Sequence, residues 1–111
     1  MLKYHYDGDV RNMMIDDIAN FINDFKTGSI EPFIKSEAVP DPQVVNGLTT
    51  IVGKTFDSIV NDPERDVLVK YYAPWCDHCK ALAPIWDELA KEVEDIDDLV
   101  IAKIDATAND I

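Results

Sequence analysis

Hydrophobic residues near the start of the chain recur at steps of three and four positions, with aspartates and asparagines between them. The pattern runs from Met13 to Lys26 and predicts an amphipathic helix of about three turns, because positions three and four apart share one helical face. Gly28 follows the last turn and is expected to end the helix, since glycine adopts a left-handed C-terminal cap at little cost. The apolar stripe is interpreted as a packing face, because the acidic polar face does not suit a membrane surface.

A different pattern begins at Leu48, where short aliphatic and β-branched runs alternate with helical periodicity. Strands are expected at 49–52, 66–73 and 99–106, and helices after Thr55 and from Cys76 to about Asp95, the longer one kinked at Pro84. The second and third strands are apolar on both faces, as expected where helices cover both sides of a parallel sheet. The alternation predicts an α/β fold of βαβαβ order with right-handed crossovers.

Residues 29–47 separate these two patterns. They contain three prolines and alternating charges without a sustained period, which is typical of an extended linker. No strand pattern precedes the first helix, so residues 1–28 are interpreted as the last element of a preceding module. The chain is therefore divided into a terminal helix at 1–28, a linker at 29–47 and an α/β unit at 48–111.

The chain of 111 residues carries 22 acidic and 10 basic side chains, for a formal net charge of -12. A field of this sign repels phosphate, so neither nucleic acid nor an anionic membrane is expected as a partner. No segment approaches the roughly 20 apolar residues needed to cross a bilayer, and no apolar run of signal-peptide length is present at the start. The excess acids are interpreted as a solubilising surface.

Cys76 and Cys79 are the only cysteines, and they lie where the second strand pattern gives way to the long helix. Two cysteines at this spacing can close a disulfide across one helical turn, while unpaired N–H groups at the helix start favour the thiolate of the first. We therefore predict a redox-active dithiol that needs no other cofactor. In it, Cys76 attacks a substrate disulfide and Cys79 resolves the mixed disulfide.

His78 lies between the two cysteines. Its cationic form is expected to stabilise the Cys76 thiolate and make the disulfide more oxidising, although a histidine at a helix start is also commonly a solvated surface residue. A zinc site formed by Cys76, His78 and Cys79 is the alternative use of the same atoms. It is disfavoured, because tetrahedral zinc usually takes four ligands and the only other histidine, His5, is distant in the sequence.

Two runs around the cysteines resemble a known family. The run from Val67 to Pro84, which contains APWCDHCK, and the run from Val100 to Thr107 are similar to a catalytic thioredoxin-like domain of protein disulfide isomerases. The resemblance covers roughly residues 48–111, and the first helix with residues 29–37 resembles the join between the second non-catalytic and second catalytic domains of that family. It implies a thioredoxin-like fold that stops before the C-terminal hairpin and helix, in a slice of a longer protein.

The resemblance also implies a function. Family members are thiol–disulfide oxidoreductases and isomerases that act on cysteines of unfolded or misfolded secretory polypeptides in the endoplasmic reticulum lumen, with glutathione or a thiol oxidase as redox partner. The competing hypothesis is a non-catalytic interaction segment with little turnover of its own. Without the strands that follow in the family, the strand at 66–73 is expected to present an unpaired edge that favours self-association. Trp75 is expected to be part of a substrate-contacting rim, as its family counterpart is, or a cap on the helix.

Two positions depart from the family's pattern. Asp77 replaces the usual glycine, and its carboxylate is expected to disfavour the Cys76 thiolate and make the centre a weaker oxidant. Lys70 lies six residues before Cys76, where many relatives place a buried carboxylate. Lys103 matches a lysine that partners that carboxylate, so two cations are expected to face each other here. Slower proton transfer at Cys79, with its thiolate favoured by charge, is the expected result.

Overall fold

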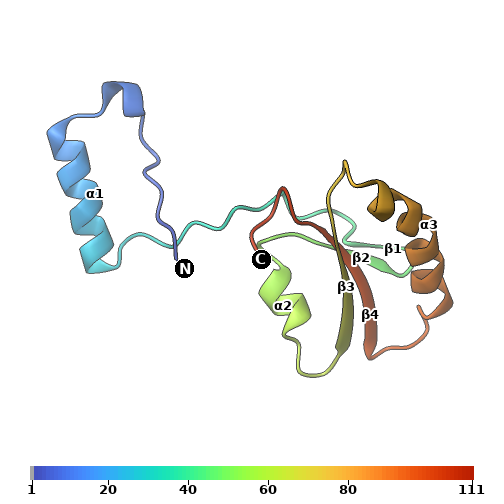
Figure 1. The fold of residues 1–111 in the computed structure, drawn as a ribbon. Coiled ribbons are helices and arrows are strands. Elements are labelled where there is room, and N and C mark those ends of the chain that lie inside the picture. The colour runs from blue at the N-terminus through green and yellow to red at the C-terminus, as the bar shows by residue number, and fades with distance from the viewer. Residues whose placement is uncertain (1) are drawn as a thin grey trace. The chain divides into compact units, whose positions relative to one another are not determined.

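The computed structural model describes residues 2–111, which form two compact units. The N-terminal unit extends to Ile34, and the sheet unit runs from Lys35 to Ile111 (Figure 1). Each unit has its own packing. No helix among the described residues combines the length and the apolar character that a membrane span requires.

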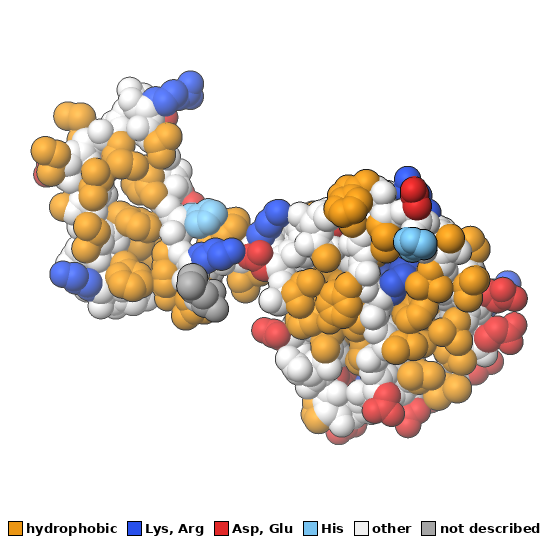
Figure 2. Space-filling model, in the orientation of Figure 1, with side chains coloured by type: hydrophobic (Ala, Val, Ile, Leu, Met, Phe, Trp, Pro, Cys, Tyr) orange, Lys and Arg blue, Asp and Glu red, His pale blue; other side chains and the backbone are white. Residues whose placement is uncertain are grey.

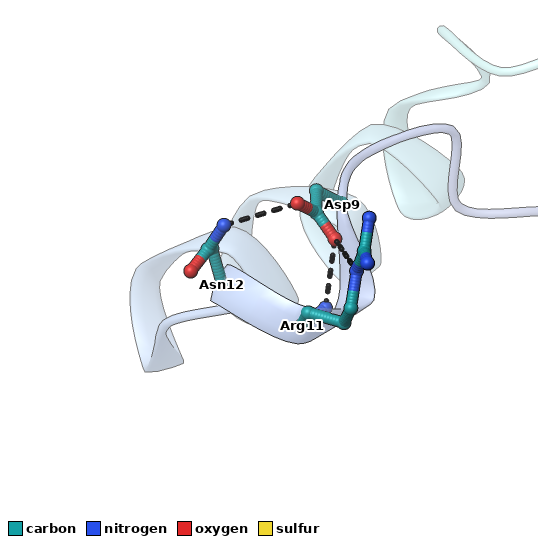
Figure 3. Close-up of polar contacts among 3 residues, drawn as sticks. All are labelled: Asp9, Arg11 and Asn12. Atoms are coloured by element: carbon teal, nitrogen blue, oxygen red, sulfur yellow. Dashed lines mark hydrogen bonds and ion pairs between the residues drawn. The ribbon is translucent and has the colours of Figure 1, made fainter.

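The N-terminal unit contains a short 3-10 turn, η1 (Val10–Asn12), whose start is capped by Asp9. One carboxylate oxygen of Asp9 accepts the backbone N–H of Arg11 at 2.9 Å and its side-chain Nε–H at 3.4 Å (Figure 3). The other oxygen accepts the side-chain amide of Asn12 at 3.0 Å. The aspartate therefore satisfies a backbone donor that the turn itself leaves without a partner.

Helix α1 (Ile15–Thr27) is the amphipathic helix that the sequence predicts. At its start, the Asp17 carboxylate accepts the backbone N–H of Met14 at 2.9 Å. At its end, Gly28 adopts a φ of 75°, which confirms the predicted left-handed cap. Both ends of the helix therefore follow from local sequence signals.

Aromatic side chains of the segment before α1 pack against the helix edge to face. The ring centroids of Tyr4 and Phe25 lie 4.8 Å apart, and those of Tyr6 and Phe21 lie 5.9 Å apart. Such pairs add to the stabilisation from buried area. Other apolar side chains of the helix stay open within this unit, and Ile15 is 85% exposed.

The sheet unit contains, in chain order, β1 (Val44–Val45), β2 (Leu48–Ile51), α2 (Phe56–Val60), β3 (Asp66–Tyr72), α3 (Asp77–Glu92) and β4 (Leu99–Asp105). The strand order across the sheet is β1-β2-β4-β3. Strand β4 is parallel to both neighbours, with Ile101 beside Leu48 of β2 and Leu68 of β3. The predicted α/β fold of βαβαβ order with parallel strands is therefore confirmed.

Strand β1 is absent from the sequence prediction, and it makes the sheet mixed, because it pairs antiparallel with β2. Asn46 and Gly47 join the two strands with φ angles of 51° and 81°. Positive φ at both central residues is the mark of the tight hairpin turn that Asn-Gly favours. Residues 35–47 of the predicted linker thus lie within the sheet unit, whereas the assignment of residues 1–28 to a preceding domain stays a prediction.

Apolar residues pack on both faces of the sheet, because α2 and α3 lie on opposite sides of it (Figure 1). The buried residues on the α3 side are Leu48, Ala90 and Ile101, and those on the α2 side are Ile51, Ala102 and Ile104. Trp86 of α3 packs against the first group and donates its indole N–H to the Ala102 carbonyl at 2.9 Å. Trp86 is therefore a packing residue of this face.

Predicted features of the two helices differ in detail from the structure. Thr55 precedes α2 at the N-cap position, but its hydroxyl bonds to the backbone of Val52 rather than to a helix N–H. Helix α3 ends at Glu92, slightly before the predicted end near Asp95. Pro84 lies inside α3, and the kink expected there stays a prediction.

The segment that begins at Lys35 is tied to the residues that follow β4. The amide oxygen of Asn109, which is 4% exposed, accepts the backbone N–H groups of Glu37 and Gly53 at 2.8 and 2.9 Å. Its side-chain N–H donates to the Glu37 carboxylate at 2.8 Å. The backbone N–H of Lys35 also donates to the Asp110 carboxylate at 2.8 Å. These bonds fix Glu37 against the carboxyl end of the sheet.

Candidate active site

The two cysteines lie at the junction between β3 and α3. Cys76 is the N-cap residue of α3, with an extended backbone (φ -82°, ψ 115°), and its N–H donates to the Ala73 carbonyl at 3.1 Å. The Cys76 Sγ accepts the backbone N–H of Cys79 at 3.2 Å. This sulfur therefore receives one of the free donors of the first helical turn and faces the positive end of the helix dipole. Both effects favour negative charge on it.

Both thiols are reduced and partly buried. The hydrogen bond with the Cys76 side chain is the largest influence that lowers the pKa of Cys79, and a backbone hydrogen bond with Ala73 adds to it. Burial raises that pKa, and the positive charge of Lys70 lowers it. Because the pKa is lowered by folding, this thiolate stabilises the fold fully above pH 9.0, and the contribution is lost as the pH falls through the lowered pKa.

Cys79 lies on the side of α3 that faces the sheet. The partly or fully buried positions of the helix include Cys79, Ala83, Trp86 and Ala90, at helical spacing. Ala90 packs with Ile101, whereas Trp86 reaches Ala102, one residue further along β4. The helix therefore runs antiparallel to the strands, and its first turn, with Cys79, lies over the carboxyl ends of β3 and β4.

Those strand ends carry charged and aromatic side chains on the face toward α3. The register places Lys70 beside Lys103 and Tyr72 beside Asp105. These residues share a face with Ile101, which packs on α3, because alternate residues of a strand point to the same side. The Lys70 Nζ lies 5.5 Å from the centroid of the Tyr72 ring. Two lysines, a tyrosine and an aspartate thus underlie the first turn of α3.

The two lysines lie in different surroundings. Lys103 lines a cavity of about 540 Å³ between the sheet and α3, together with Asp87, Glu88 and Lys91 of the helix. The Lys70 Nζ lies instead against the ring of Tyr72. Within the described part of the chain, the side-chain ion pairs are made by Arg11 and Arg65, so neither Lys70 nor Lys103 takes part in one.

Three residues that the sequence predicts for the site lie at the surface beside Cys76. Trp75 is 76% exposed, and its predicted part in a substrate-contacting rim stays a prediction. Asp77 and His78 are both exposed. Asp77 is in the first turn of α3, where a carboxylate also interacts favourably with the helix dipole.

The surface of the sheet unit near the dithiol is partly apolar. Figure 2 shows hydrophobic side chains exposed on this unit, and the exposed large apolar residues of β3 and α3 include Leu68, Leu82 and Ile85. Strand β3 is also the outermost strand of the described sheet. This surface therefore combines a free strand edge with apolar side chains.

Tyr72 and Glu37 belong to the site, and the sequence prediction misses both. Burial, followed by the charges of Asp105 and Glu37, raises the pKa of Tyr72. The sequence holds a signal for Tyr72, because a residue two positions from Lys70 on a strand shares its face. The sequence holds no such signal for Glu37, which is held near Tyr72 by its hydrogen bonds with Asn109.

The structure also bears on the zinc alternative. No group of three or more His, Cys, Asp or Glu side chains is placed to hold a metal ion anywhere between residues 2 and 111. The set of Cys76, His78 and Cys79 is therefore not assembled as a ligand cluster here.

Comparison with known proteins gives consistent results. The family model described as Thioredoxin matches residues 47–111. The chain is 49% identical over 109 residues to a protein disulfide-isomerase of Aspergillus oryzae, covering 98% of this chain and 21% of the relative. It is 52% identical over 96 residues to protein disulfide-isomerase A4 of Mus musculus, covering 86% of this chain and 15% of the relative. The chain thus spans about a fifth or less of the length of these curated relatives.

Among solved structures, the first thioredoxin domain of mouse protein disulfide-isomerase A4 matches with a TM-score of 0.48 and 38% identity, covering 68% of this chain and 48% of that one. The family match covers more than half of the chain and includes every strand from β2 onward, both sheet-covering helices and the two cysteines. The chain therefore belongs to the thioredoxin family, through a thioredoxin-like domain of the protein disulfide isomerase type.

Proposed function

We propose that the chain carries the redox centre of a protein disulfide isomerase-type thiol–disulfide oxidoreductase. The observation that carries the proposal is the 3.2 Å hydrogen bond from the Cys79 N–H to the Cys76 Sγ at the start of α3. Disulfide exchange requires a thiolate nucleophile, and this bond favours negative charge on Cys76. It also keeps a second thiol one helical turn away. Similarity to protein disulfide-isomerases over most of the chain supports the same chemistry.

The exchange proceeds in two steps. The Cys76 thiolate attacks one sulfur of a substrate disulfide, which forms a mixed disulfide and releases the other substrate sulfur as a thiolate. The Cys79 thiolate then attacks the Cys76 Sγ, which closes the Cys76–Cys79 disulfide and releases the second substrate thiolate. The substrate disulfide is reduced by two electrons and the pair is oxidised. The reverse sequence donates a disulfide to the substrate. Isomerisation occurs when a different substrate thiolate attacks the substrate sulfur of the mixed disulfide, which forms a new substrate disulfide and releases the Cys76 thiolate.

The proposed substrates are cysteine-containing polypeptides that are folding in the endoplasmic reticulum lumen. Two surface features suit them: the exposed ring of Trp75 next to Cys76, and the apolar side chains exposed on β3 and α3. The exposed His78, in its cationic form, favours the Cys76 thiolate. Glutathione or a thiol oxidase restores the oxidised pair, and no cofactor besides the dithiol is needed.

The experiment that tests this function is reduction of insulin and reactivation of scrambled ribonuclease by the purified chain. We expect both reactions to run faster than with an equal concentration of the double variant Cys76→Ser, Cys79→Ser. This control retains the fold and the apolar surface, so it measures any effect of binding without exchange. If the wild type and the control give equal rates, the redox proposal fails and a non-catalytic interaction segment is supported.

Replacing Asp77 with glycine is expected to make the dithiol more oxidising. The exposed carboxylate lies beside Cys76 at the start of α3 and opposes negative charge on its sulfur, so its removal stabilises the reduced form. A surface charge interaction below about 1 kcal/mol corresponds to a potential about 10 to 20 mV higher. The glutathione equilibrium of the pair measures this change.

Two further variants separate charge from backbone effects at Asp77. Asp77→Asn removes the charge without adding the flexibility of glycine, and it should reproduce most of the shift. Glu92→Gln removes a charge from the last residue of the same helix, about four turns further on, where the dithiol should not sense it. High salt should reduce the Asp77 effect, because the carboxylate is solvated. An unchanged or lower potential in Asp77→Gly contradicts the prediction.

A further inference from the structure

The resolving thiol has a positively charged residue beneath it whose position is not set by any carboxylate. Helix α3 packs with Ala90 over Ile101 and Trp86 over Ala102, so Cys79 lies over the strand ends that carry Lys70 and Tyr72. In the described part of the chain no ion pair involves Lys70. What holds the long, flexible side chain of Lys70 in place must therefore be another kind of contact.

Two neighbours on the same sheet face determine where the Lys70 ammonium lies. Lys103 is its register partner on β4 and repels it, and Lys103 itself lines a cavity with Asp87, Glu88 and Lys91 of α3. Tyr72, two residues further along β3, offers the face of its ring, and the Lys70 Nζ lies 5.5 Å from the ring centroid. This distance is within the range in which a cation is attracted by an aromatic ring.

We propose that Tyr72 is a positioning residue for the resolving step, because its ring holds the Lys70 ammonium beneath Cys79, where the positive charge favours the thiolate that attacks the mixed disulfide. The proposal rests on the proposed function, since it concerns the same dithiol. It adds a residue that acts through Lys70.

The ionisation state of Tyr72 determines whether Lys70 is attracted by the aromatic ring or by a phenolate charge. Burial raises the pKa of Tyr72, and the negative charges of Asp105 and Glu37 raise it further. The phenol therefore stays neutral while the thiols titrate, and Lys70 is attracted by the ring face rather than by a phenolate. The positive charge of Lys70, in turn, is among the causes that lower the pKa of Cys79, after its hydrogen bonds with Cys76 and Ala73.

Other charged groups around Lys70 and Tyr72 also affect the charge that Cys79 experiences. They are Asp105 and Lys103 on β4, Glu37 in the segment held by Asn109, and Asp77, His78 and Lys80 in the first turn of α3. The helix residues are exposed and solvated, so salt screens them more than it screens the partly buried Lys70. An effect of Tyr72 that persists in high salt is therefore expected to come from Lys70.

The test is the pH profile of Cys79 alkylation by iodoacetamide, measured on the full chain in a Cys76→Ser background. We expect Tyr72→Leu and Lys70→Met each to shift the profile to higher pH and to slow alkylation at neutral pH. Tyr72→Phe keeps the aromatic face and should restore the wild-type profile. The double variant Tyr72→Leu, Lys70→Met should shift the profile no further than Lys70→Met alone, because Tyr72 acts only through Lys70.

A second measurement follows the resolving step directly. With Cys76 present and loaded with glutathione as a mixed disulfide, release of glutathione should be slower in Tyr72→Leu and Lys70→Met than in Tyr72→Phe. A Tyr72→Leu shift that persists in the Lys70→Met background overturns the proposal, as does a profile unchanged by either variant. If Tyr72→Leu fails to fold, Tyr72→Met, which also removes the aromatic ring, takes its place in both measurements with the same expected shift.

Alkylation needs no substrate turnover, so this inference and the proposed function can fail separately. A chain that is inactive on insulin but shows the coupled profile refutes the function and keeps the role of Tyr72. A chain that is active on insulin but lacks the coupled profile supports the function and refutes the role of Tyr72.

Discussion

Replacing Cys79 with alanine is expected to convert the chain from a catalyst into a trap for its substrates. Cys76 keeps its place as the N-cap of α3 and can still attack a disulfide, but no second thiol remains to displace the substrate. Covalent mixed disulfides with scrambled ribonuclease should accumulate, and net insulin reduction should fall by about two orders of magnitude or more. Non-reducing electrophoresis and mass spectrometry measure the adducts.

The matched control is Cys76→Ala, which removes the proposed nucleophile and leaves Cys79 in the inner stripe of the helix. It should form few adducts and show no turnover. Adducts that form in Cys76→Ala and not in Cys79→Ala would reverse the assigned roles of the two thiols. That result would also contradict the importance of the bond from the Cys79 N–H to the Cys76 Sγ.

Replacing Gly47 with alanine is expected to cause the largest loss of stability of any small substitution in the turn between β1 and β2. Gly47 has a φ of 81°, which side chains other than glycine rarely adopt. A Cβ there would lie 2.5 Å from the Ala90 carbonyl oxygen and 2.9 Å from the Glu94 Cβ. Backbone strain and displacement of α3 together should cost about 2 to 4 kcal/mol.

Chemical denaturation, followed by the fluorescence of Trp86, measures this loss, because that side chain packs in the α3 side of the core. Asn46→Ala is the control, since Asn46 also has a positive φ, of 51°, but is exposed. It should cost about 1 kcal/mol, the strain alone. Equal losses in the two variants would show that α3 moves aside easily, and the predicted clash would be wrong.

Several elements of this chain could be predicted because their signals are local. The steps of three and four in α1 and the glycine after it are contained within about four helical turns of sequence. The continuous apolar run of β4 likewise indicates burial on both faces, whereas the outermost strand β3 leaves Leu68 and Tyr71 each 48% exposed. Strand β1 is absent from the prediction although Asn46-Gly47 is a hairpin signal, because three prolines nearby favour a linker over a strand.

The candidate site likewise contains features that local sequence predicts and features that only long-range contacts create. The spacing of Cys76 and Cys79 and their place at a strand-to-helix junction are properties of ten residues, and they predict a dithiol before any tertiary contact is known. The surroundings of that dithiol are not local. Glu37 and Asn109 are 72 residues apart in the chain, yet they share two hydrogen bonds that hold a carboxylate near Tyr72.

The local sequence thus predicts parallel strands, covering helices and a pair of closely spaced thiols at a helix start. What lies beneath Cys79 depends instead on long-range contacts, namely on the register between β3 and β4 and on the packing of α3. A slip of one residue in that register would turn Lys70 and Tyr72 to the other face of the sheet, away from Cys79. The pairing of strands, which no local pattern specifies, therefore sets the charge near Cys79.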